Sequence, residues 1–298
     1  MSQRSSQRDA ASRAASDAAS DAANGVTIHP SAVVDPGAEL APGVIVGAHA
    51  VIGSQVTLGG GTEVMPGAQI QGPTVLGREN RVYPYACIGF DPQDLKFDPE
   101  DESRLVVGDR NQFREFCTVH RGTGFGGGVT TVGDDNLFMA YCHVAHDCHV
   151  GSRTIFVNNA TLAGHVEVGD DATIGAFSSV HQFCRVGAHA YIGGYSVITM
   201  DALPYVKTVG QKPACYGVNV IGLRRKGFDR VSIRRLQDAY RTFVTSGLNT
   251  EQALAEIRVD LGEHEELAHL IEFIDSAKRG VIKTLPGKRS GRGEGEAG

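Results

Sequence analysis

The sequence predicts a mainly β fold: a left-handed parallel β-helix of hexapeptide repeats, followed by a small C-terminal α-helical domain. Large aliphatic or aromatic residues recur every six positions from Ile28 to Ile88 and again from Val132 to Ile198. The residue two places before each is mostly small, and Gly, Asp or Asn often follows, as a chain that turns a corner requires. A period of six fits neither a strand nor a helix, so each hexad is interpreted as a short strand plus a corner.

Three hexads complete one triangular coil in such a solenoid, so residues three hexads apart should stack at a spacing of roughly 4.8 Å. His146 should then stack on Gly164 and Gln182, and Asp147 should stack on His165. These residues are distant in sequence but converge on one edge of the solenoid. That edge is the candidate site.

Departures from the six-residue period divide the chain. The first 24 residues are rich in Ala, Ser, Arg and Asp and lack the apolar run of about 7 to 15 residues that a secretory signal needs. The predicted segments are a disordered tail at 1–24, the β-helix at 25–200 with excursions near 90–106 and 120–131, a connector at 201–222, an α-helical domain at 223–287 and a disordered tail at 288–298.

The two excursions are long loops in a compact solenoid, and such loops are usually functional. The second contains the run Gly126-Gly-Gly128, which could cradle a phosphate group. No helix follows the run, so we favour a flexible loop.

Beyond the connector the apolar spacing becomes helical. The first predicted helix has Asp229 as its N-cap and Gly247 as its stop signal. A second helix should begin at Thr250, and a third should end near Gly280.

Composition narrows the possible functions. The net charge of −6 gives no general affinity for nucleic acid, and no stretch approaches the roughly 20 apolar residues of a membrane span, so we expect no stable membrane insertion. An aromatic content of 7% with no Trp and 38 Gly fits a solenoid filled with aliphatic side chains. Several cysteines fall on small inward positions and are interpreted as packed thiols in a reducing cytoplasm. They are Cys117, Cys142, Cys148 and Cys184.

Basic residues gather on the first predicted helix and its approach, although the protein is acidic as a whole. They are Arg224, Arg225, Lys226, Arg230, Arg234, Arg235 and Arg241. Such a cluster can be a solvated helix face or a docking patch for an acidic partner.

Several motifs closely resemble those of the bacterial acyl-carrier-protein-dependent UDP-N-acetylglucosamine O-acyltransferases, the family that begins lipid A synthesis. The resemblance covers roughly Thr27 to Lys283. Hexads alone are weak evidence, because many transferases share them, whereas the His-Asp-Cys, Ala-Gly-His and His-Gln-Phe-Cys blocks in this order are specific. The matching motifs are His143-Val-Ala-His146-Asp147-Cys, Leu162-Ala-Gly164-His165, Val180-His181-Gln182-Phe-Cys, Gln93-Asp94-Leu-Lys96, His120-Arg-Gly-Thr, Pro204-Tyr-Val and Gly217-Val-Asn219.

The resemblance implies transfer of an (R)-3-hydroxyacyl group from acyl carrier protein to the glucosamine 3-hydroxyl of UDP-N-acetylglucosamine, without a cofactor or a metal. His146 matches the general base, a role suited to a side chain that titrates near neutral pH. Asp147 matches the residue that orients this base, which requires a corner, because neighbours on a regular strand face opposite ways. Gly164 would offer its backbone N–H to the thioester oxyanion.

The resemblance also implies a set of substrate contacts. Positions around the sugar nucleotide are matched by Asp94, Lys96, His143, His165, Gln182, Asn219 and Arg225. Ile221 departs from the pattern, because the best-known members have Glu there. Gly194 matches the family position whose side chain blocks the end of the acyl-chain groove and so sets the chain length by its size. Because glycine has no side chain there, the groove should stay open and we expect a long acyl chain.

Two other functions stay open at this stage. Some hexapeptide-repeat proteins are zinc carbonic anhydrases, and His143, His146 and His165 could be metal ligands by composition. That scheme leaves Asp147 and Gln182 without a use. A non-catalytic scaffold would leave the excursions unexplained. We further expect a homotrimer, since a site on an outer edge can be closed only by a neighbouring subunit.

Overall fold

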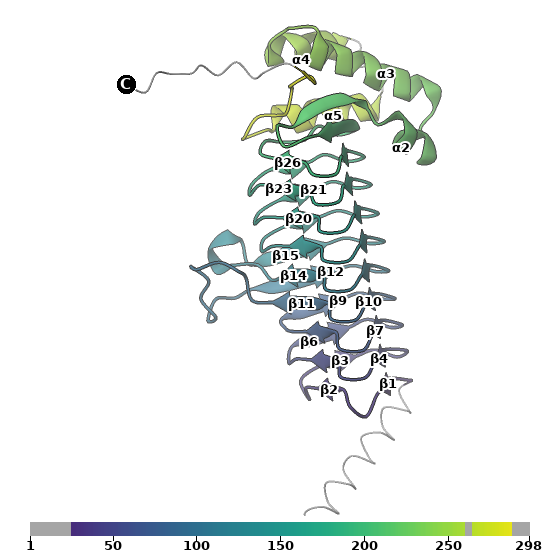
Figure 1. Ribbon diagram of the computed structural model, residues 1–298, viewed down its shortest axis with the longest axis vertical. Coiled ribbons are helices and arrows are strands. Elements are labelled where there is room, and N and C mark those ends of the chain that lie inside the picture. Colours follow the sequence, from purple (N-terminus) through teal and green to yellow (C-terminus); the bar gives the residue numbers. More distant parts are fainter. Residues whose placement is uncertain (1–24, 260–263, 288–298) are drawn as a thin grey trace, which may run out of the picture.

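The computed structural model describes residues 25–259 and 264–287. The tails predicted at 1–24 and 288–298 lie outside these residues. The described chain forms a long solenoid whose helices sit at one end, beyond the last coils (Figure 1). The prediction of a mainly β fold with C-terminal helices is confirmed.

The solenoid has three sheets, whose strands are parallel except for β28 at the end of sheet A. Sheet A contains β1 (Thr27–Ile28), β4 (Ile45–Val46), β7 (Glu63–Val64), β10 (Arg81–Val82), β13 (Gln112–Phe113), β16 (Leu137–Phe138), β19 (Ile155–Phe156), β22 (Thr173–Ile174), β25 (Tyr191–Ile192), β27 (Val206–Val209) and β28 (Ala214–Val218). Sheet B contains β2 (Val33–Val34), β5 (Val51–Ile52), β8 (Gln69–Ile70), β11 (Cys87–Phe90), β14 (Thr118–His120), β17 (His143–Val144), β20 (Thr161–Leu162), β23 (Ser179–Val180) and β26 (Val197–Ile198). Sheet C contains β3 (Glu39–Leu40), β6 (Val56–Leu58), β9 (Thr74–Leu76), β12 (Arg104–Val107), β15 (Val129–Val132), β18 (His149–Val150), β21 (Glu167–Val168) and β24 (Arg185–Val186).

The sheets meet at three edges, named here for the sheets they join. In the coil that carries His146, the AB edge is residues 139–142, the BC edge is 145–148 and the AC edge is 151–154. Corners hold non-glycine residues with positive φ, such as Asp147 at 56° and His165 at 60°. Each corner turns the chain into the next sheet, as the hexads predict.

The large residues of the period fill the interior. Phe113, Phe138 and Phe156 stack ring on ring, with centroids 5.0 and 4.7 Å apart. Small partners such as Cys142 and Ala160 are buried beside them. The inward positions predicted from residue size are therefore correct.

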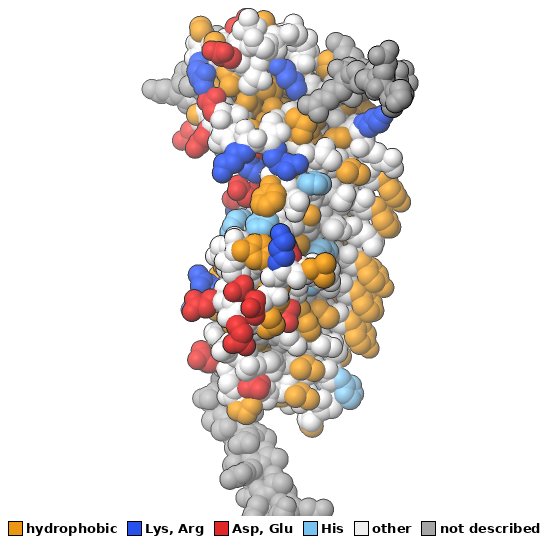
Figure 2. All heavy atoms as spheres, turned by 90° about the vertical axis from the view of Figure 1, so that its left-hand side faces the viewer, with side chains coloured by type: hydrophobic (Ala, Val, Ile, Leu, Met, Phe, Trp, Pro, Cys, Tyr) orange, Lys and Arg blue, Asp and Glu red, His pale blue; other side chains and the backbone are white. Residues whose placement is uncertain are grey.

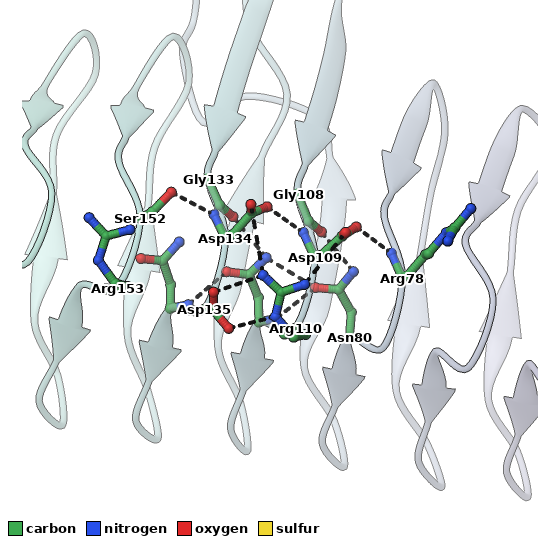
Figure 3. Close-up of polar contacts among 12 residues, drawn as sticks. Arg78, Asn80, Gly108, Asp109, Arg110, Gly133, Asp134, Asp135, Ser152 and Arg153 are labelled. Carbon is green, nitrogen blue, oxygen red and sulfur yellow. Dashed lines mark hydrogen bonds and ion pairs between the residues drawn. The ribbon is translucent and has the colours of Figure 1, made fainter.

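A buried asparagine ladder keeps the coils in register across both excursions. Asn80, labelled in Figure 3, accepts through its Oδ1 from the backbone N–H of Asn111 at 2.9 Å. Asn111 Oδ1 in turn accepts from the backbone N–H of Asn136 at 3.0 Å. These partners are 31 and 25 residues apart, whereas Asn136 and Thr154, next in the ladder, are 18 apart. The residues in excess of 18 per coil all lie at the BC edge. The excursions therefore form loops at that edge, while the asparagine ladder at the AC edge stays continuous.

The segment expected as a connector contains regular structure. Strands β27 and β28 pair antiparallel and extend sheet A, and α2 (Val220–Arg225) follows. The hairpin covers the last coil, whose strand would otherwise have exposed backbone groups.

The helical region follows the sequence prediction closely. Asp229 caps α3 (Arg230–Tyr240) by accepting from the Ser232 amide at 2.7 Å, as predicted. A π-helical segment, η2 (Arg241–Thr245), continues α3, and α4 (Thr250–Val259) begins where expected. The last helix, α5 (Glu265–Asp275), ends before Gly280, the predicted stop. No helix in the described ranges is both long and apolar enough to cross a membrane.

Arg185 joins the helical region to the solenoid. Its Nε donates to Asp201 Oδ2 at 2.8 Å, its Nη2 donates to the Phe273 carbonyl at 2.7 Å, and its guanidinium lies 4.2 Å from the centre of the Phe273 ring. One half-buried cation therefore connects the last coils to α5.

Candidate active site

His146 and Asp147 form a hydrogen-bonded pair at the BC edge. His146 Nδ1 and Asp147 Oδ2 lie 2.8 Å apart. They point toward each other because Asp147 occupies a corner with φ of 56°, which removes the alternation of a regular strand. The corner that the orienting role requires is therefore present.

His146 is enclosed by two further groups. Its Nε2 lies 3.7 Å from Asp94 Oδ2, which comes from the first excursion. On the next coil, a Cβ added to Gly164 would lie 2.5 Å from His146 Cε1, so only glycine leaves room for the ring. The predicted stacking of Gly164 on His146 is confirmed, and the ring has little freedom to move.

Asp147 is almost fully buried and richly hydrogen-bonded. Thr123 donates twice, from its amide to Oδ1 at 3.0 Å and from Oγ1 to Oδ2 at 2.6 Å. The Asp147 amide donates to Thr130 Oγ1 at 2.8 Å. Burial raises the pKa of Asp147, but hydrogen bonds from His146 and Thr123 outweigh burial and lower the pKa. The buried carboxylate therefore stays ionised beside the imidazole.

The neighbouring histidines differ from His146 in their surroundings. His143 Nδ1 lies 2.7 Å from Thr118 Oγ1, and burial, aided by His120 and His146, lowers the pKa of His143 to about 4. His165 stands edge-on to His146 and stacks on Phe183 at 4.4 Å, and burial lowers its pKa as well. Both rings are held neutral at neutral pH, which suits hydrogen bonding to substrate.

Other predicted site residues lie at the rim of this edge. Lys96 is exposed in the first excursion, where its backbone amide donates to Asp94 Oδ1 at 2.8 Å. Gln182 is exposed on the coil beyond Gly164. The first excursion thus brings Asp94 to His146, with Lys96 next to Asp94.

Asn219 and Arg225 do not join this cluster within one chain. Asn219 caps α2 and donates to the His189 carbonyl at 3.1 Å, at the AC edge. Figure 1 shows α2 on the opposite side of the solenoid from the excursions. Arg225 is exposed at the end of α2, and Ile221 is exposed on the same helix.

The predicted basic patch is divided in the structure. Lys226 Nζ lies 2.6 Å from Asp171 Oδ1 at the AC edge, so its charge is largely compensated there. Arg224 is exposed on α2, whereas Arg230, Arg234 and Arg235 line a groove of about 590 Å³ between α3 and α4.

Sequence reasoning missed the residues that hold Asp147. Thr123 lies in the His120-Arg-Gly-Thr motif, and this motif with the following Gly run was the available signal. We expected a flexible loop there, but the structure has a compact turn, in which the Gly126 and Gly128 amides both donate to the Thr123 carbonyl.

Comparisons with known proteins identify the family. A hexapeptide-repeat transferase model matches residues 25–60, 130–164 and 165–199, and a model described as UDP-N-acetylglucosamine O-acyltransferase domain 2 matches 201–282. An acyl-[acyl-carrier-protein]–UDP-N-acetylglucosamine O-acyltransferase of Burkholderia orbicola is 46% identical over 213 residues, which is 70% of this chain and 80% of the relative. The chain belongs to the UDP-N-acetylglucosamine O-acyltransferase family.

Solved structures of the family show the same architecture. The UDP-N-acetylglucosamine acyltransferase of Francisella novicida is 36% identical with a TM-score of 0.85, covering 88% of this chain and 95% of that one. The Arabidopsis UDP-N-acetylglucosamine acyltransferase is 37% identical with a TM-score of 0.77, covering 86% of this chain and 100% of that one. Membership in this acyltransferase family supports the resemblance over the carbonic anhydrase and scaffold alternatives.

Proposed function

We propose that the protein transfers an (R)-3-hydroxyacyl group from acyl carrier protein to the 3-hydroxyl of UDP-N-acetylglucosamine, the first step of lipid A synthesis. The single observation that carries the proposal is the His146–Asp147 pair, closed by Gly164. The reaction needs a base that removes a hydroxyl proton, and an imidazole fixed by a carboxylate provides one.

The geometry supports a simple reaction sequence. His146 Nε2 takes the hydroxyl proton while the oxygen attacks the thioester carbonyl, forming the C–O bond. The C–S bond then breaks, and the imidazolium returns the proton to the departing thiolate. Among the described residues the Gly164 amide has no hydrogen-bond acceptor, which leaves it available to the oxyanion.

The sugar would bind between the first excursion and the histidines. The 3.7 Å separation of Asp94 Oδ2 and His146 Nε2 allows one hydroxyl to contact both groups after a small adjustment. His143 and His165, held neutral, would donate to or accept from the sugar, with Lys96 and Gln182 at the rim.

Mass spectrometry of the product tests this proposal directly. Purified protein incubated with UDP-N-acetylglucosamine and a set of hydroxyacyl carrier proteins should yield the O-acylated nucleotide sugar. A protein that leaves every donor unreacted while binding the nucleotide sugar would contradict the proposal.

The active assembly is proposed to be a homotrimer. Exposed aromatic residues stack along the AB edge: Tyr85, Phe116 and Tyr141 at 5.4 and 4.9 Å, and Phe177 and Tyr195 at 5.1 Å. Figure 2 shows a column of hydrophobic side chains along one edge of the solenoid. Such a column favours burial against another copy.

A trimer would also complete the site. Asn219 and Arg225 lie across the solenoid from His146, so a neighbouring subunit could present them to the nucleotide. Light scattering at micromolar concentration tests the assembly, and a stable monomer would contradict it. We place the reaction in the cytoplasm, where the six free cysteines would stay reduced.

The α3–α4 groove is the proposed docking site for acyl carrier protein. Its lining includes three basic residues, two acidic residues and apolar side chains such as Ile257. The charged residues are Arg230, Arg234, Arg235, Asp238 and Glu256. Figure 2 shows acidic side chains gathered over the N-terminal coils and basic side chains, with some acidic ones among them, nearer the helices; histidines lie between the two regions. An acidic carrier would be steered to the basic end.

Reversing two charges in this groove should weaken the carrier interaction. Arg230→Glu with Arg234→Glu should raise KM for acyl carrier protein about tenfold and reduce its salt dependence, because rim charges mainly set association rates. KM for UDP-N-acetylglucosamine should not change. Arg258→Glu, on α4 outside the groove and already paired with Asp275, is the matched control. An unchanged KM for the carrier would contradict the docking proposal and would mean that the basic cluster is only a solvated helix face.

Gly194 is the proposed determinant of acyl chain length. It is exposed at the AB edge, and an added Cβ would meet only Ala176 backbone atoms, the nearest at 3.3 Å. A larger side chain therefore fits, and glycine leaves the groove open for a chain of about fourteen carbons, whose methylenes contribute roughly 0.8 kcal/mol each when buried.

Gly194→Met should shift the preferred donor to about ten carbons, because a blocked groove forfeits several methylenes of roughly 0.8 kcal/mol each. Competition between donors of different lengths, read by mass spectrometry, measures the shift. Turnover with short donors should stay near the unmodified rate. If the variant keeps its long-chain preference, Gly194 is not the residue that determines the acyl chain length.

A further inference from the structure

The second excursion encloses the Asp147 carboxylate. Both carboxylate oxygens are used: Oδ1 accepts from the Thr123 amide, and Oδ2 accepts from Thr123 Oγ1 and contacts His146 Nδ1. Asp147 is 2% exposed and Thr123 is 0% exposed, so water cannot replace these donors readily. The hydroxyl and the imidazole share one oxygen, and each limits where the other can lie.

Two glycines of this excursion lie against the carboxylate. A Cβ on Gly126 would overlap Asp147 Oδ2, and a Cβ on Gly122 would lie 2.8 Å from Oδ1. A larger residue at Gly126 would push the carboxylate away from His146, whereas at Gly122 it would also meet the backbone of Gly128 and Val129. Gly126 is thus the residue of the Gly run that allows close approach to a buried anion of the protein itself.

The turn is anchored independently of the site. Arg121, which is 8% exposed, donates to the Gly72 and Gly89 carbonyls at 2.6 and 3.1 Å and pairs with Asp91. These contacts connect the second excursion to the coil below and to the first excursion. Thr123 is therefore held in place by contacts that do not involve His146.

We propose that Thr123 is a positioning residue and that residues 121–128 act as a carboxylate clamp, which aims Asp147 at His146 Nδ1 and leaves Nε2 free as the base. The functional consequence rests on the proposed acyl transfer. Without the hydroxyl, the carboxylate could rotate away from the ring. The Nδ1–H tautomer would then lose its preference, and fewer molecules would present an unprotonated Nε2 to the substrate hydroxyl.

Thr123→Val removes the hydroxyl and keeps the size and branching of the side chain. We expect kcat to fall roughly 10- to 100-fold, the range found when groups supporting a reactive side chain are removed. KM for both substrates should change less than about twofold, since Thr123 does not reach them. Thr123→Ser should restore most of the rate. Full activity in Thr123→Val, or equal losses in both variants, would overturn the proposal.

A control variant separates positioning from stability. Thr154→Val removes another buried threonine hydroxyl, which donates to Asn136 Oδ1 at 2.6 Å away from the site. It should lower the melting temperature at least as much as Thr123→Val and leave turnover unchanged.

The ¹⁵N chemical shifts of His146 provide a readout without substrate. Of the two neutral tautomers, Nδ1–H should dominate in the unmodified protein and in Thr123→Ser, and should lose its dominance in Thr123→Val. An unchanged tautomer in Thr123→Val overturns the clamp whatever the activity. Because this measurement needs no acyl donor, failure of the proposed function and failure of the clamp are distinguishable.

Discussion

Replacing His146 with alanine should abolish acyl transfer while the protein remains folded. Loss of a general base costs roughly 10²- to 10⁴-fold in rate, and no neighbouring group can substitute. His143 and His165 are held neutral by burial but lack the carboxylate partner at 2.8 Å that His146 has. The side chain lies on an edge outside the packed interior, so its removal should cost little stability.

The assay is turnover with the preferred hydroxyacyl carrier protein, with circular dichroism and light scattering as controls for folding and assembly. Ligand atoms of His146, Asp147 and His165 lie within 4.8 Å of one another, close enough to hold an ion. Turnover must therefore also be measured in the presence of a chelator, and we expect the chelator to leave turnover unchanged. Retained turnover in the alanine variant, or loss in chelator that zinc restores, would refute the general-base scheme.

Gly164→Ala should lower kcat/KM by a factor of about 100 or more, because misplacing a reactive group by about 1 Å has effects of this size. The added Cβ would lie 2.5 Å from His146 Cε1 and 2.7 Å from Nε2. The ring would have to turn away from the hydroxyl, or the coil would have to shift. The backbone at Gly164 has no positive φ, so alanine introduces no conformational strain of its own.

Steady-state kinetics and the His146 ring signals in NMR measure this effect together. Gly53→Ala is the matched control, because it also lies at the BC edge but its added Cβ would have ordinary contacts of 3.5 Å with Ile70 and Gln71. Near-normal kinetics in Gly164→Ala would mean that the ring is not confined as the structure indicates, and would also weaken the assignment of the Gly164 amide to the oxyanion.

Much of the fold and part of the site could be predicted from the sequence. The six-residue period sets which residues face inward and which stack on neighbouring coils, because each hexad forms its own strand and corner from local residues. His146 against Gly164, and His165 against Phe183, follow from that register alone. Local capping chemistry likewise placed the start of α3 at Asp229.

Only the tertiary structure decided how the excursions and the charged side chains are used. The period carries no information about an insertion, so the approach of Asp94 to His146 and of Thr123 to Asp147 could not be read from spacing. Lys226 belonged to the basic cluster in sequence, yet its charge is paired with Asp171, a residue from a distant coil. Repeats encode register through contacts between equivalent positions, whereas loops and long side chains are placed by whichever buried polar group they must satisfy.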